Sequence, residues 1–466
     1  MNKFLELSFK EEVPKYIQIA KHIKILIDNK RIDDGEKLPT IRDLSKVLNV
    51  NKITIVNAYK KLQSEGYAYQ KVGSGTYAKR KEVSNGFSRE YSKAIKKMNR
   101  LNSSETIDFT GESDEEFYFP IDDFKDVINK VLERDGAKAL IGKEALGYEK
   151  LRDTINKNFW NNKLNLNNIL IVTGAQQGID IVSKVIVNIN DNVIVEKPTY
   201  AGALSVFKWR KANIFEVDIE EDGINLEAFE EILKKNKISC FYTMSYFHNP
   251  TGISYSLEKK LKLLELANKY DFYIIEDDYL SELIYDENIK YESFKKIDKY
   301  DRVIYLKSFS KVFLPGIRLG YLVAPTSFRE SIQISKVNTD AATSSLMQRA
   351  LELYISEGYF KKHIEIQNSY YKERYNLMKN LIEENLKEKI SYIDPKGGLY
   401  FYLILKNKEI DTRDIFYNLK SKGVYITPGE LFFKDNNLGK DVLRISFAKV
   451  SKEKIIEGMK LIKEEI

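Results

Sequence analysis

Cysteine, histidine and tryptophan are scarce in this sequence of 466 residues. Cys240 is the one cysteine, so no disulfide can form within the chain. The three histidines, His22, His248 and His363, are widely separated, and together with Cys240 they do not give the ligand spacing of a zinc site. These shortages exclude a disulfide-stapled scaffold and a structural zinc site. They predict no bound metal and favour a reducing compartment.

Long apolar runs are also lacking. No stretch approaches the 18 apolar residues that suggest a membrane-spanning helix, and residues 1–15 mix charged and apolar side chains instead of forming the apolar core of a signal peptide. Charged residues make up 31% of the chain and hydrophobic residues 43%, a balance that excludes a disordered chain or a membrane bundle. We therefore expect a globular, cytoplasmic protein of two or three domains.

An excess of one charge occurs in only one part of the chain. Residues 1–80 contain 16 Lys and Arg against 9 Asp and Glu, whereas residues 81–466 contain 59 of each sign. A small basic segment is typical of a domain that binds the phosphate backbone of nucleic acid. An excess of basic residues is equally typical of a lysine-rich surface that faces solvent, so the local sequence pattern is needed to distinguish the two interpretations.

The basic segment has the pattern of three helices and a hairpin. Apolar residues recur at helical spacing over 16–27, and Thr40 and Asn51 are N-cap residues for a second and a third helix. Two short strands within 67–78 flank a turn at 71–75, where glycines allow positive φ angles. This order predicts a winged helix-turn-helix domain over residues 1–80.

The rest of the chain has an alternating pattern. Residues 81–106 are rich in Ser, Asn and Lys and predict a linker, in which 91–98 could form a short helix. Over 107–466, apolar β-rich runs alternate with helical patterns such as 257–270, which predicts an α/β domain with a mostly parallel sheet and ligand sites at the carboxyl ends of its strands. The predicted strands are Ile169–Val172, Val193–Val195, Cys240–Met244, Phe272–Ile275, Val303–Leu306 and Gly320–Val323.

Residues 9–80 resemble the GntR family of winged-helix regulators. The resemblance rests on Gly-Glu-Lys-Leu-Pro-Thr-Ile-Arg-Asp-Leu at 35–44, on the segment 51–62, and on Glu-Gly-Tyr at 65–67 followed by Gly-Ser-Gly-Thr at 73–76. Where many relatives have Ser-Arg at the start of the recognition helix, this chain has Asn-Lys, which keeps a cation but removes the bidentate guanidinium. By resemblance, phosphates and base edges would be contacted by Arg42, Asn51, Lys52 and Thr54, and the wing in the minor groove would consist of Gly73, Ser74 and Gly75.

Three features of the large domain stand at the ends of predicted strands. Lys311 follows the strand at 303–306, Asp277 comes shortly after the strand at 272–275, and Thr-Gly-Ala-Gln at 173–176 joins a strand to a helix whose free amides suit a phosphate. Pyridoxal phosphate (PLP) requires these three groups: a lysine for the Schiff base, an acid for the ring nitrogen and an anion site. Lys311 is therefore our Schiff-base candidate, although most lysines in any chain are surface residues.

Residues 107–466 resemble the fold-type I aminotransferases. The resemblance rests on Ser-Phe-Ser-Lys at 308–311 with Pro-Gly-Ile-Arg-Leu-Gly-Tyr at 315–321, Asp-Asp-Tyr at 277–279, Asn-Pro-Thr-Gly at 249–252 and Lys-Pro-Thr-Tyr at 197–200. It implies that Lys311 carries PLP and that Asp277 pairs with the ring nitrogen. It further implies that Asn249 and Tyr279 bind the ring hydroxyl and that Tyr200 stacks on the ring, although a core role for a tyrosine is the alternative. The phosphate would lie on Gly174, Ala175, Gln176, Ser308, Ser310 and Arg318.

A strand pattern near the end of the chain, Leu443–Phe447, places one arginine, Arg444, between apolar neighbours, and a buried arginine needs an anion. The resemblance implies that Arg444 binds the α-carboxylate of an amino-acid ligand through two parallel hydrogen bonds, and a structural ion pair is the alternative. One departure concerns a tyrosine that many relatives place a few residues before the glycine matching Gly147, where it reaches the phosphate of the neighbouring subunit. This chain has Ile141 and Gly142 there.

The order of the two domains resembles the MocR/GabR family of bacterial transcription regulators. It implies a homodimer that binds a double-stranded DNA operator, holds PLP on Lys311 and senses an amine or amino-acid effector, which exchanges onto the cofactor as an external aldimine. Two alternatives stay open: a catalytically active PLP-dependent aminotransferase with an accessory basic domain, and a sensor of PLP itself. Lys311 and Arg318 serve all three functions, and Arg444 favours an amino-acid ligand over PLP sensing.

Overall fold

Two units make up the chain. The computed structural model describes residues 7, 9, 13–28, 31–33, 35–65, 67–71, 73–79, 86–99, 106–111, 119–142, 144–340, 342–435 and 437–466. Contacts between Cα atoms divide the chain into Met1–Lys96 and Lys97–Ile466.

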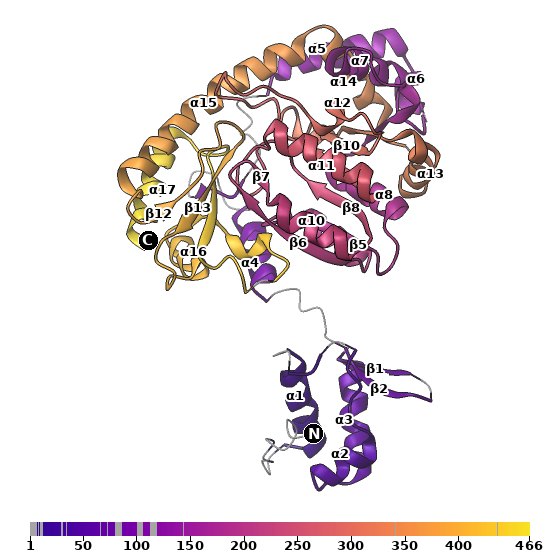
Figure 1. Ribbon diagram of the computed structural model, residues 1–466. Coiled ribbons are helices and arrows are strands. Elements are labelled where there is room, and N and C mark those ends of the chain that lie inside the picture. Colours follow the sequence, from indigo (N-terminus) through magenta and orange to yellow (C-terminus); the bar gives the residue numbers. More distant parts are fainter. Residues whose placement is uncertain are drawn as a thin grey trace. The chain divides into compact units, whose positions relative to one another are not determined.

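The first unit is the winged helix-turn-helix that the sequence predicts (Figure 1). Thr40 and Asn51 cap the second and third helices, because their side-chain oxygens accept the backbone N–H groups of Asp43 and Ile53. Helices α1 and α2 both pack against α3, and the two strands form an antiparallel hairpin. The elements are α1 (Lys15–Asp28), α2 (Ile41–Val47), α3 (Lys52–Ser64), β1 (Ala68–Lys71) and β2 (Gly75–Ala78).

A further helix, α4 (Gly86–Met98), occupies half of the range whose composition predicts a linker. The expected short helix at 91–98 therefore begins earlier in the chain. Phe87, Ala94 and Met98 are buried and, with Tyr91, recur every three or four residues, which is helical spacing. Lysines between these apolar residues obscure the stripe in the sequence. The remaining parts of the predicted linker, 81–85 and 100–105, lie outside the described residues.

The second unit is built on an eight-stranded sheet with the order β4-β11-β10-β9-β8-β5-β6-β7. Neighbours from β10 to β6 are parallel, whereas β11 is antiparallel to both β4 and β10, and β7 is antiparallel to β6. The predicted α/β domain with a mostly parallel sheet is confirmed, and the predicted strand at 320–323 is one of its antiparallel members. The strands are β4 (Ile169–Val172), β5 (Asn192–Lys197), β6 (Asn213–Glu220), β7 (Gly223–Ile224), β8 (Ile238–Thr243), β9 (Tyr273–Asp278), β10 (Val303–Ser308) and β11 (Gly320–Val323).

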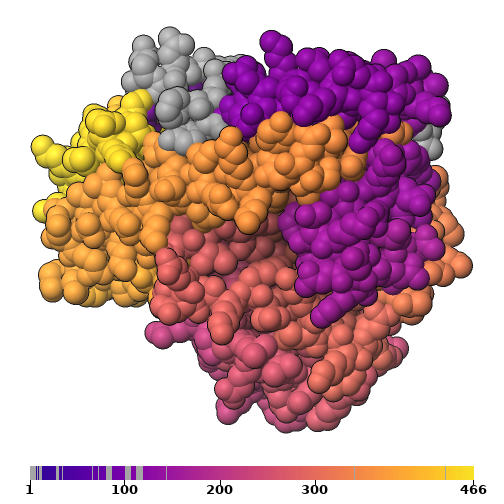
Figure 2. Space-filling model, turned by 90° about the horizontal axis from the view of Figure 1, so that it is seen from above, coloured from indigo at the N-terminus to yellow at the C-terminus, as the bar shows by residue number. Residues whose placement is uncertain are grey.

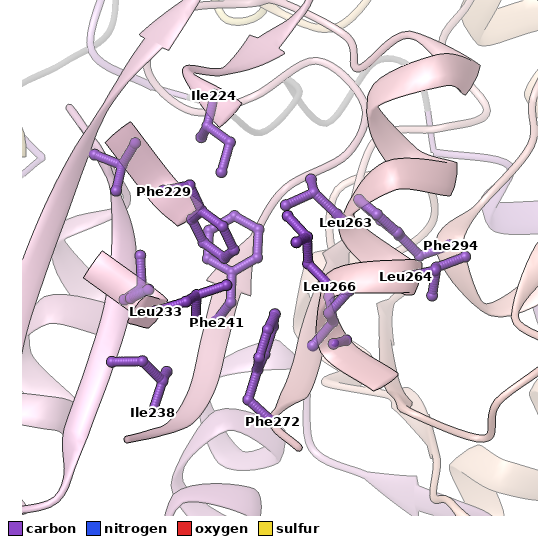
Figure 3. Packing of buried hydrophobic residues seen from close by; sticks show 14 of the residues in the cluster. Ile224, Phe229, Leu233, Ile238, Phe241, Leu263, Leu264, Leu266, Phe272 and Phe294 are labelled. Atoms are coloured by element: carbon purple, nitrogen blue, oxygen red, sulfur yellow. The ribbon is translucent and has the colours of Figure 1, made fainter. Parts of the chain in front are cut away.

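Helices cover this sheet, and every residue of β4, β10 and β11 is buried, as expected for strands covered on both faces. In the apolar cluster of Figure 3, the ring centroid of Phe229 lies 5.0 Å from that of Phe241 and 5.8 Å from that of Phe272. The helices are α5 (Ile121–Asp135), α6 (Lys138–Ile141), α7 (Glu149–Trp160), α8 (Ala175–Ile186), α9 (Ala201–Trp209), α10 (Leu226–Lys235), α11 (Leu257–Tyr270), α12 (Phe294–Ile297), α13 (Arg329–Thr339) and α14 (Ser345–Ser356). Short 3-10 helices occupy Leu166–Asn168, Pro315–Ile317, Thr326–Phe328 and Gly429–Phe432.

A smaller four-stranded sheet, with the order β12-β13-β16-β15, follows the long helix α15 (Tyr359–Asn385). Figure 2 shows the orange segment that includes α15 running beside the purple segment that includes α5 and α7. Near the small sheet, α15 packs against α17. The elements are β12 (Ile390–Ser391), β13 (Tyr400–Leu405), α16 (Thr412–Ser421), β14 (Val424–Tyr425), β15 (Thr427–Pro428), β16 (Val442–Ser446) and α17 (Lys452–Glu465), and β14 pairs with β3 (Ile107–Asp108).

Two features are not found in the part of the chain that the structure describes. No helix there has both the length and the apolar character needed to cross a bilayer. Over the same residues, no three His, Cys, Asp or Glu side chains come together as metal ligands would.

Candidate cofactor site

A cavity of about 270 Å³ lies where the central strands of the large sheet end. The turns after β4 and β10 and the last residues of β9 all contribute to it, because the carboxyl ends of parallel strands meet at one edge of a sheet. All the residues predicted to hold the cofactor line this cavity. The lining consists of Gly174, Ala175, Gln176, Tyr200, Met244, Asn249, Asp277, Tyr279, Ser308, Ser310, Lys311 and Arg318.

Asp277 lies near the end of β9 and is 3% exposed. Burial raises the pKa of its carboxyl group to about 7, although a hydrogen bond from Tyr242 favours the ionised form. The Tyr242 hydroxyl donates to Asp277 Oδ2 at 2.7 Å, while Oδ1 is buried without a hydrogen-bond partner. A buried oxygen of this kind lacks a donor, and the protonated pyridine nitrogen of PLP is a donor of the right charge.

A second group of side chains forms an anion site around Gly174 at the start of α8. Gly174 has φ +118°, and a Cβ placed on it would lie 3.8 Å from Arg318 Nη2, 3.8 Å from Ser310 Oγ and 3.9 Å from Ser308 Oγ. The Ser310 hydroxyl is buried without a hydrogen-bond partner. Three donors and the free amides of a helix N-terminus therefore surround one small space, which fits a phosphate group.

Two lysines lie near the end of β10, and their surroundings differ. Lys311 is partly buried and lines the cavity. Lys307 is 2% exposed and pairs with Asp278 at 3.0 Å and with Glu282 at 2.6 Å. Burial opposes the charged form of Lys307, but the two carboxylates outweigh it and raise its pKa. Since Lys307 is held protonated in an ion pair, Lys311 is the better candidate for a reactive amine.

Arg444 lies on β16 of the small sheet, does not line the cavity, and reaches it through Asn249. Its Nη1 donates to Asn249 Oδ1 at 2.8 Å and its Nη2 to the Thr110 carbonyl oxygen at 3.1 Å. The side chain is 5% exposed, and the guanidinium carbon lies 4.5 Å from the ring centroid of Tyr400. These two hydrogen-bond partners are neutral, and a carboxylate is the group that forms paired hydrogen bonds with a guanidinium.

Hydroxyl groups occupy another side of the cavity. The Tyr279 hydroxyl donates to the Phe247 carbonyl oxygen at 3.2 Å and is in close contact with the hydroxyl of Tyr400. The Tyr200 hydroxyl donates to Gln176 Oε1 at 3.3 Å. Tyr200 is partly buried and lines the cavity, which is the position that the predicted stacking on the ring requires.

Three residues of the site do not follow from the motifs: Tyr242, Met244 and Tyr400. Alternation puts Tyr242 and Met244 on one face, because they are two residues apart at the end of β8. The pairing of Tyr242 with Ile275 on β9 brings that face to Asp277, and the sequence pattern does not give this register. Tyr400 comes from the small sheet, so its contact with Tyr279 depends on how the two sheets pack.

The predicted DNA-contacting residues lie at two places on the first unit. Arg42, Asn51 and Lys52 are exposed at the starts of α2 and α3, and Thr54 is partly buried. Asn51 has a structural function as well, since its Oδ1 accepts the Ile53 backbone N–H at 3.1 Å. In the wing, Gly73 and Gly75 have φ angles of +74° and +126°, and the Ser74 hydroxyl lies 2.6 Å from that of Tyr77.

The departure at residues 141 and 142 is also visible. Ile141 is the last residue of α6 and is 72% exposed. Gly142 follows it, and a Cβ there would lie 2.6 Å from Ser345 Oγ, so this position packs tightly against α14. The tyrosine nearest to these positions in the sequence is Tyr148, whose ring centroid lies 3.9 Å from the guanidinium carbon of Arg349.

Comparison with known proteins assigns both units. Residues 118–462 match the aminotransferase class I and II family, and residues 15–78 match the gntR family of bacterial regulatory proteins. The chain is 32% identical to aromatic-amino-acid aminotransferase 1 of Thermococcus litoralis, over 78% of this chain and 89% of that protein. It is 29% identical to the uncharacterized HTH-type transcriptional regulator YdfD of Bacillus subtilis, over 97% of both chains.

A solved structure extends these comparisons. The α-aminoadipate aminotransferase LysN of Thermus thermophilus, complexed with N-(5'-phosphopyridoxyl)-L-leucine, superposes with a TM-score of 0.72 at 27% identity, over 82% of this chain and 98% of LysN. PLP is the cofactor of proteins with this fold, which agrees with a cavity that offers a lysine, a buried acid and an anion site. The chain therefore belongs to the aminotransferase class I and II family and carries ahead of that domain a gntR-type DNA-binding domain, the arrangement of the MocR/GabR-like regulators.

Proposed function

We propose that this protein is a transcription regulator that binds PLP and responds to an amine or amino acid. The observation that carries the proposal is the combination in one chain of a gntR-type domain with a cavity in which the groups for each part of PLP come together. The similarity to an HTH-type regulator extends over 97% of both chains, which favours a regulator over an enzyme with an unrelated extra domain.

Each part of the cavity has a task in binding the cofactor. Ser308, Ser310, Arg318 and the N-terminus of α8 would hold the phosphate, and Asp277 Oδ1 would accept a hydrogen bond from the ring nitrogen. When bound, PLP supplies an aldehyde that condenses with amines and a ring that withdraws electrons from the carbon next to the amine. Lys311 is the amine of this chain that takes part in that condensation.

The proposed effector carries an amine, which would compete with Lys311 for the cofactor aldehyde, and an amino-acid effector would in addition place its carboxylate on Arg444. Because Arg444 donates to Asn249 Oδ1, a carboxylate on Arg444 changes the hydrogen bonding of a residue that lines the cofactor cavity. The hydrogen bond between Arg444 and Asn249 therefore links the effector site to the cofactor cavity. This contact is the route by which we expect the effector to change the large unit.

The protein acts as a homodimer in this proposal. Two copies present two recognition helices to one operator, and losing simultaneous contact of both lowers the apparent affinity for DNA without changing either contact. A typical coupling of about 1 to 3 kcal/mol corresponds to roughly a 5- to 150-fold change in operator affinity.

A second candidate is a working aminotransferase with an accessory basic domain. It is favoured by the 32% identity to an aromatic-amino-acid aminotransferase and by the buried acid that keeps the cofactor ring protonated. A sensor of PLP alone is the third candidate, and it would need no contact between the effector and Arg444.

Operator titration distinguishes the three candidates. DNA binding is measured at fixed PLP with and without each of the common amino acids, and keto-acid product is measured in the same samples. The proposal expects one amino acid to shift operator affinity, and it expects Arg444→Lys, which keeps the charge but loses the bidentate geometry, to weaken that response while PLP loading and basal DNA binding persist. Multiple turnover without a change in DNA binding would support the aminotransferase, and a response to PLP alone would support the PLP sensor.

A further inference from the structure

The exposed face of α3 carries one large apolar side chain. Ile53 lies in the first turn of this helix and is 66% exposed. The helix buries Ile55, Ala58, Tyr59 and Leu62 against the core of the unit. At about 100° per residue, Ile53 lies on the side of the helix opposite that buried face, in agreement with its exposure.

Two polar side chains lie on the same exposed face of α3 as Ile53 and form a stripe with it. Asn57 and Lys60 follow Ile53 at four and seven residues, which is the spacing of one helix face, and both are exposed. The neighbouring Lys61 differs, because its Nζ lies 2.8 Å from Glu65. The stripe therefore presents an isoleucine, an amide and an ammonium group, on a unit whose first 80 residues have 16 basic against 9 acidic side chains.

The chemistry of the DNA major groove fits this set of side chains. The apolar group that base edges display there is the thymine C5-methyl group, and an Asn side chain makes paired hydrogen bonds with N6 and N7 of adenine. Ile53 and Asn57 lie about 6 Å apart along the helix axis, which is comparable to one or two base-pair steps. The stripe can thus meet neighbouring base pairs.

We propose that Ile53 reads a thymine methyl group and that Asn57 reads an adenine edge, so that each operator half-site has A·T pairs under the first turns of α3. This inference rests on the proposed DNA-binding function and names the bases that function selects. Lys60, further along the same face, and Lys52, at the start of the helix, contact phosphates and supply affinity without selecting a base. The Asn51 cap fixes the first turn, and with it the direction of the Ile53 side chain.

Thymine-to-uracil substitution tests this, because it removes only the methyl group. The full-length protein is titrated with the footprinted region of its own promoter, in which each thymine is replaced in turn. We expect one position in each half-site to weaken binding by about 4-fold, the effect of one buried methyl-sized group. Ile53→Ala should give a similar loss on the unmodified operator, and uracil at that position should weaken binding of the variant no further.

Controls separate this inference from the proposed function. Ile25→Ala removes a comparable isoleucine, 45% exposed on α1, and should leave the uracil effect unchanged. For Asn57, replacing adenine by 7-deazaadenine should weaken the wild type but not Asn57→Ala. If no thymine position depends on its methyl group, or if the uracil penalty persists in Ile53→Ala, the inference is wrong although the protein binds its promoter. If the unmodified protein does not prefer its promoter to random duplex, the proposed function itself fails.

Discussion

Asp277 and Asp278 are adjacent in the chain, yet their carboxyl groups meet opposite environments. Successive residues of a strand point to opposite faces of the sheet, so Asp277 faces the cofactor cavity and Asp278 faces a buried network on the other side. Burial opposes ionisation of Asp278, but Lys307 and the hydroxyls of Tyr291 and Tyr305 outweigh it and lower its pKa. Among the described residues, Asp277 has Tyr242 as its one side-chain donor, and burial raises its pKa to about 7.

The raised pKa of Asp277 predicts a pH-dependent stability of the protein without PLP. The pKa of this carboxyl group rises from 3.8 to about 7 on folding, so the folded state binds its proton more tightly than the unfolded state does. The resulting contribution to stability is complete below about pH 4 and is lost as the pH rises from about 4 through 7, because ionisation then favours the unfolded chain. Asp277→Asn is neutral throughout, so its free energy of unfolding should exceed that of the wild type above pH 7 by as much as about 4 kcal/mol, and the difference should shrink toward pH 4. Denaturant unfolding at pH 4 to 8 measures it.

The exposed Asp122 on α5 provides the control for this experiment. Because its carboxyl group is exposed, Asp122→Asn should not show a gain of about 4 kcal/mol above pH 7. A destabilised Asp277→Asn at pH 8 would contradict the assignment, because it would mean that the ionised carboxylate has a donor in the folded protein. With PLP bound, the order should reverse, since the ring nitrogen then supplies that donor.

Lys311 and Lys307 lead to a prediction about covalent labelling. Borohydride reduction of the PLP-loaded protein should fix the cofactor to the peptide that contains Ser308 to Arg318, at Lys311 and not at Lys307. Lys311→Arg keeps the positive charge but cannot form the imine, so it should bind PLP only reversibly, through the phosphate groups. Peptide mass spectrometry locates the label, and a label at Lys307 would be inconsistent with its buried ion pairs.

At the scale of elements, the turn between β4 and α8 makes the anion site. A strand followed directly by a helix brings the free amides of the helix to the edge of the sheet, and Gly174 is the residue that allows this close approach. Its φ of +118° lies in a region that side chains with a Cβ rarely adopt. The backbone of this turn therefore depends on glycine both for its conformation and for the space beside Arg318.

Gly174→Ala should weaken PLP binding more than it weakens folding. The added methyl group would occupy the space between the Ser308, Ser310 and Arg318 side chains, while the unfavourable φ costs about 1 to 3 kcal/mol of folding free energy. Fluorescence titration with PLP measures the first effect and thermal unfolding the second. Gly316→Ala is the matched control, because a Cβ there meets no atom within 4 Å, and it should change neither. Unchanged PLP affinity in Gly174→Ala would rule out this phosphate position.

At the scale of the whole molecule, the two units differ in net charge. The first 80 residues carry the surplus of basic side chains and the remainder is balanced, so electrostatic attraction to the phosphates of DNA would come from the small unit, whereas the cofactor cavity lies in the large unit. Regulation then requires that binding to one unit changes the affinity of the other. Such a coupling is reciprocal for equilibrium binding.

Reciprocity gives a prediction for the intact protein. If an amino acid changes operator affinity by a certain factor, saturating operator duplex must change the affinity for that amino acid by the same factor. The absorbance of bound PLP during amino-acid titration, with and without operator, measures the second factor. A scrambled duplex of equal length is the control and should leave the titration unchanged. Unequal factors would mean that turnover, and not equilibrium binding, produces the response.

The sequence alone determined the features that depend on nearby residues. Thr40 and Asn51 cap their helices as predicted, and helix 257–270 and strand 169–172 have the predicted bounds, because caps and apolar periodicity act within a few residues. Lys311 could be selected in the same way, since its turn follows directly on an apolar strand.

Tertiary structure decided the contacts between distant residues. Arg444 and Asn249 form a hydrogen bond although they are 195 positions apart in the sequence. The hydrogen bond from Tyr242 to Asp277 depends on the register of the parallel strands β8 and β9. Many registers and sheet arrangements satisfy the same local pattern, so periodicity could not select these pairs. The apolar face of α4 could not be recognised in the sequence for a related reason. Lysines lie between its apolar residues, and which side of a helix is buried depends on the elements that pack against it. The site chemistry follows from the residues, and its geometry follows from the packing of two sheets.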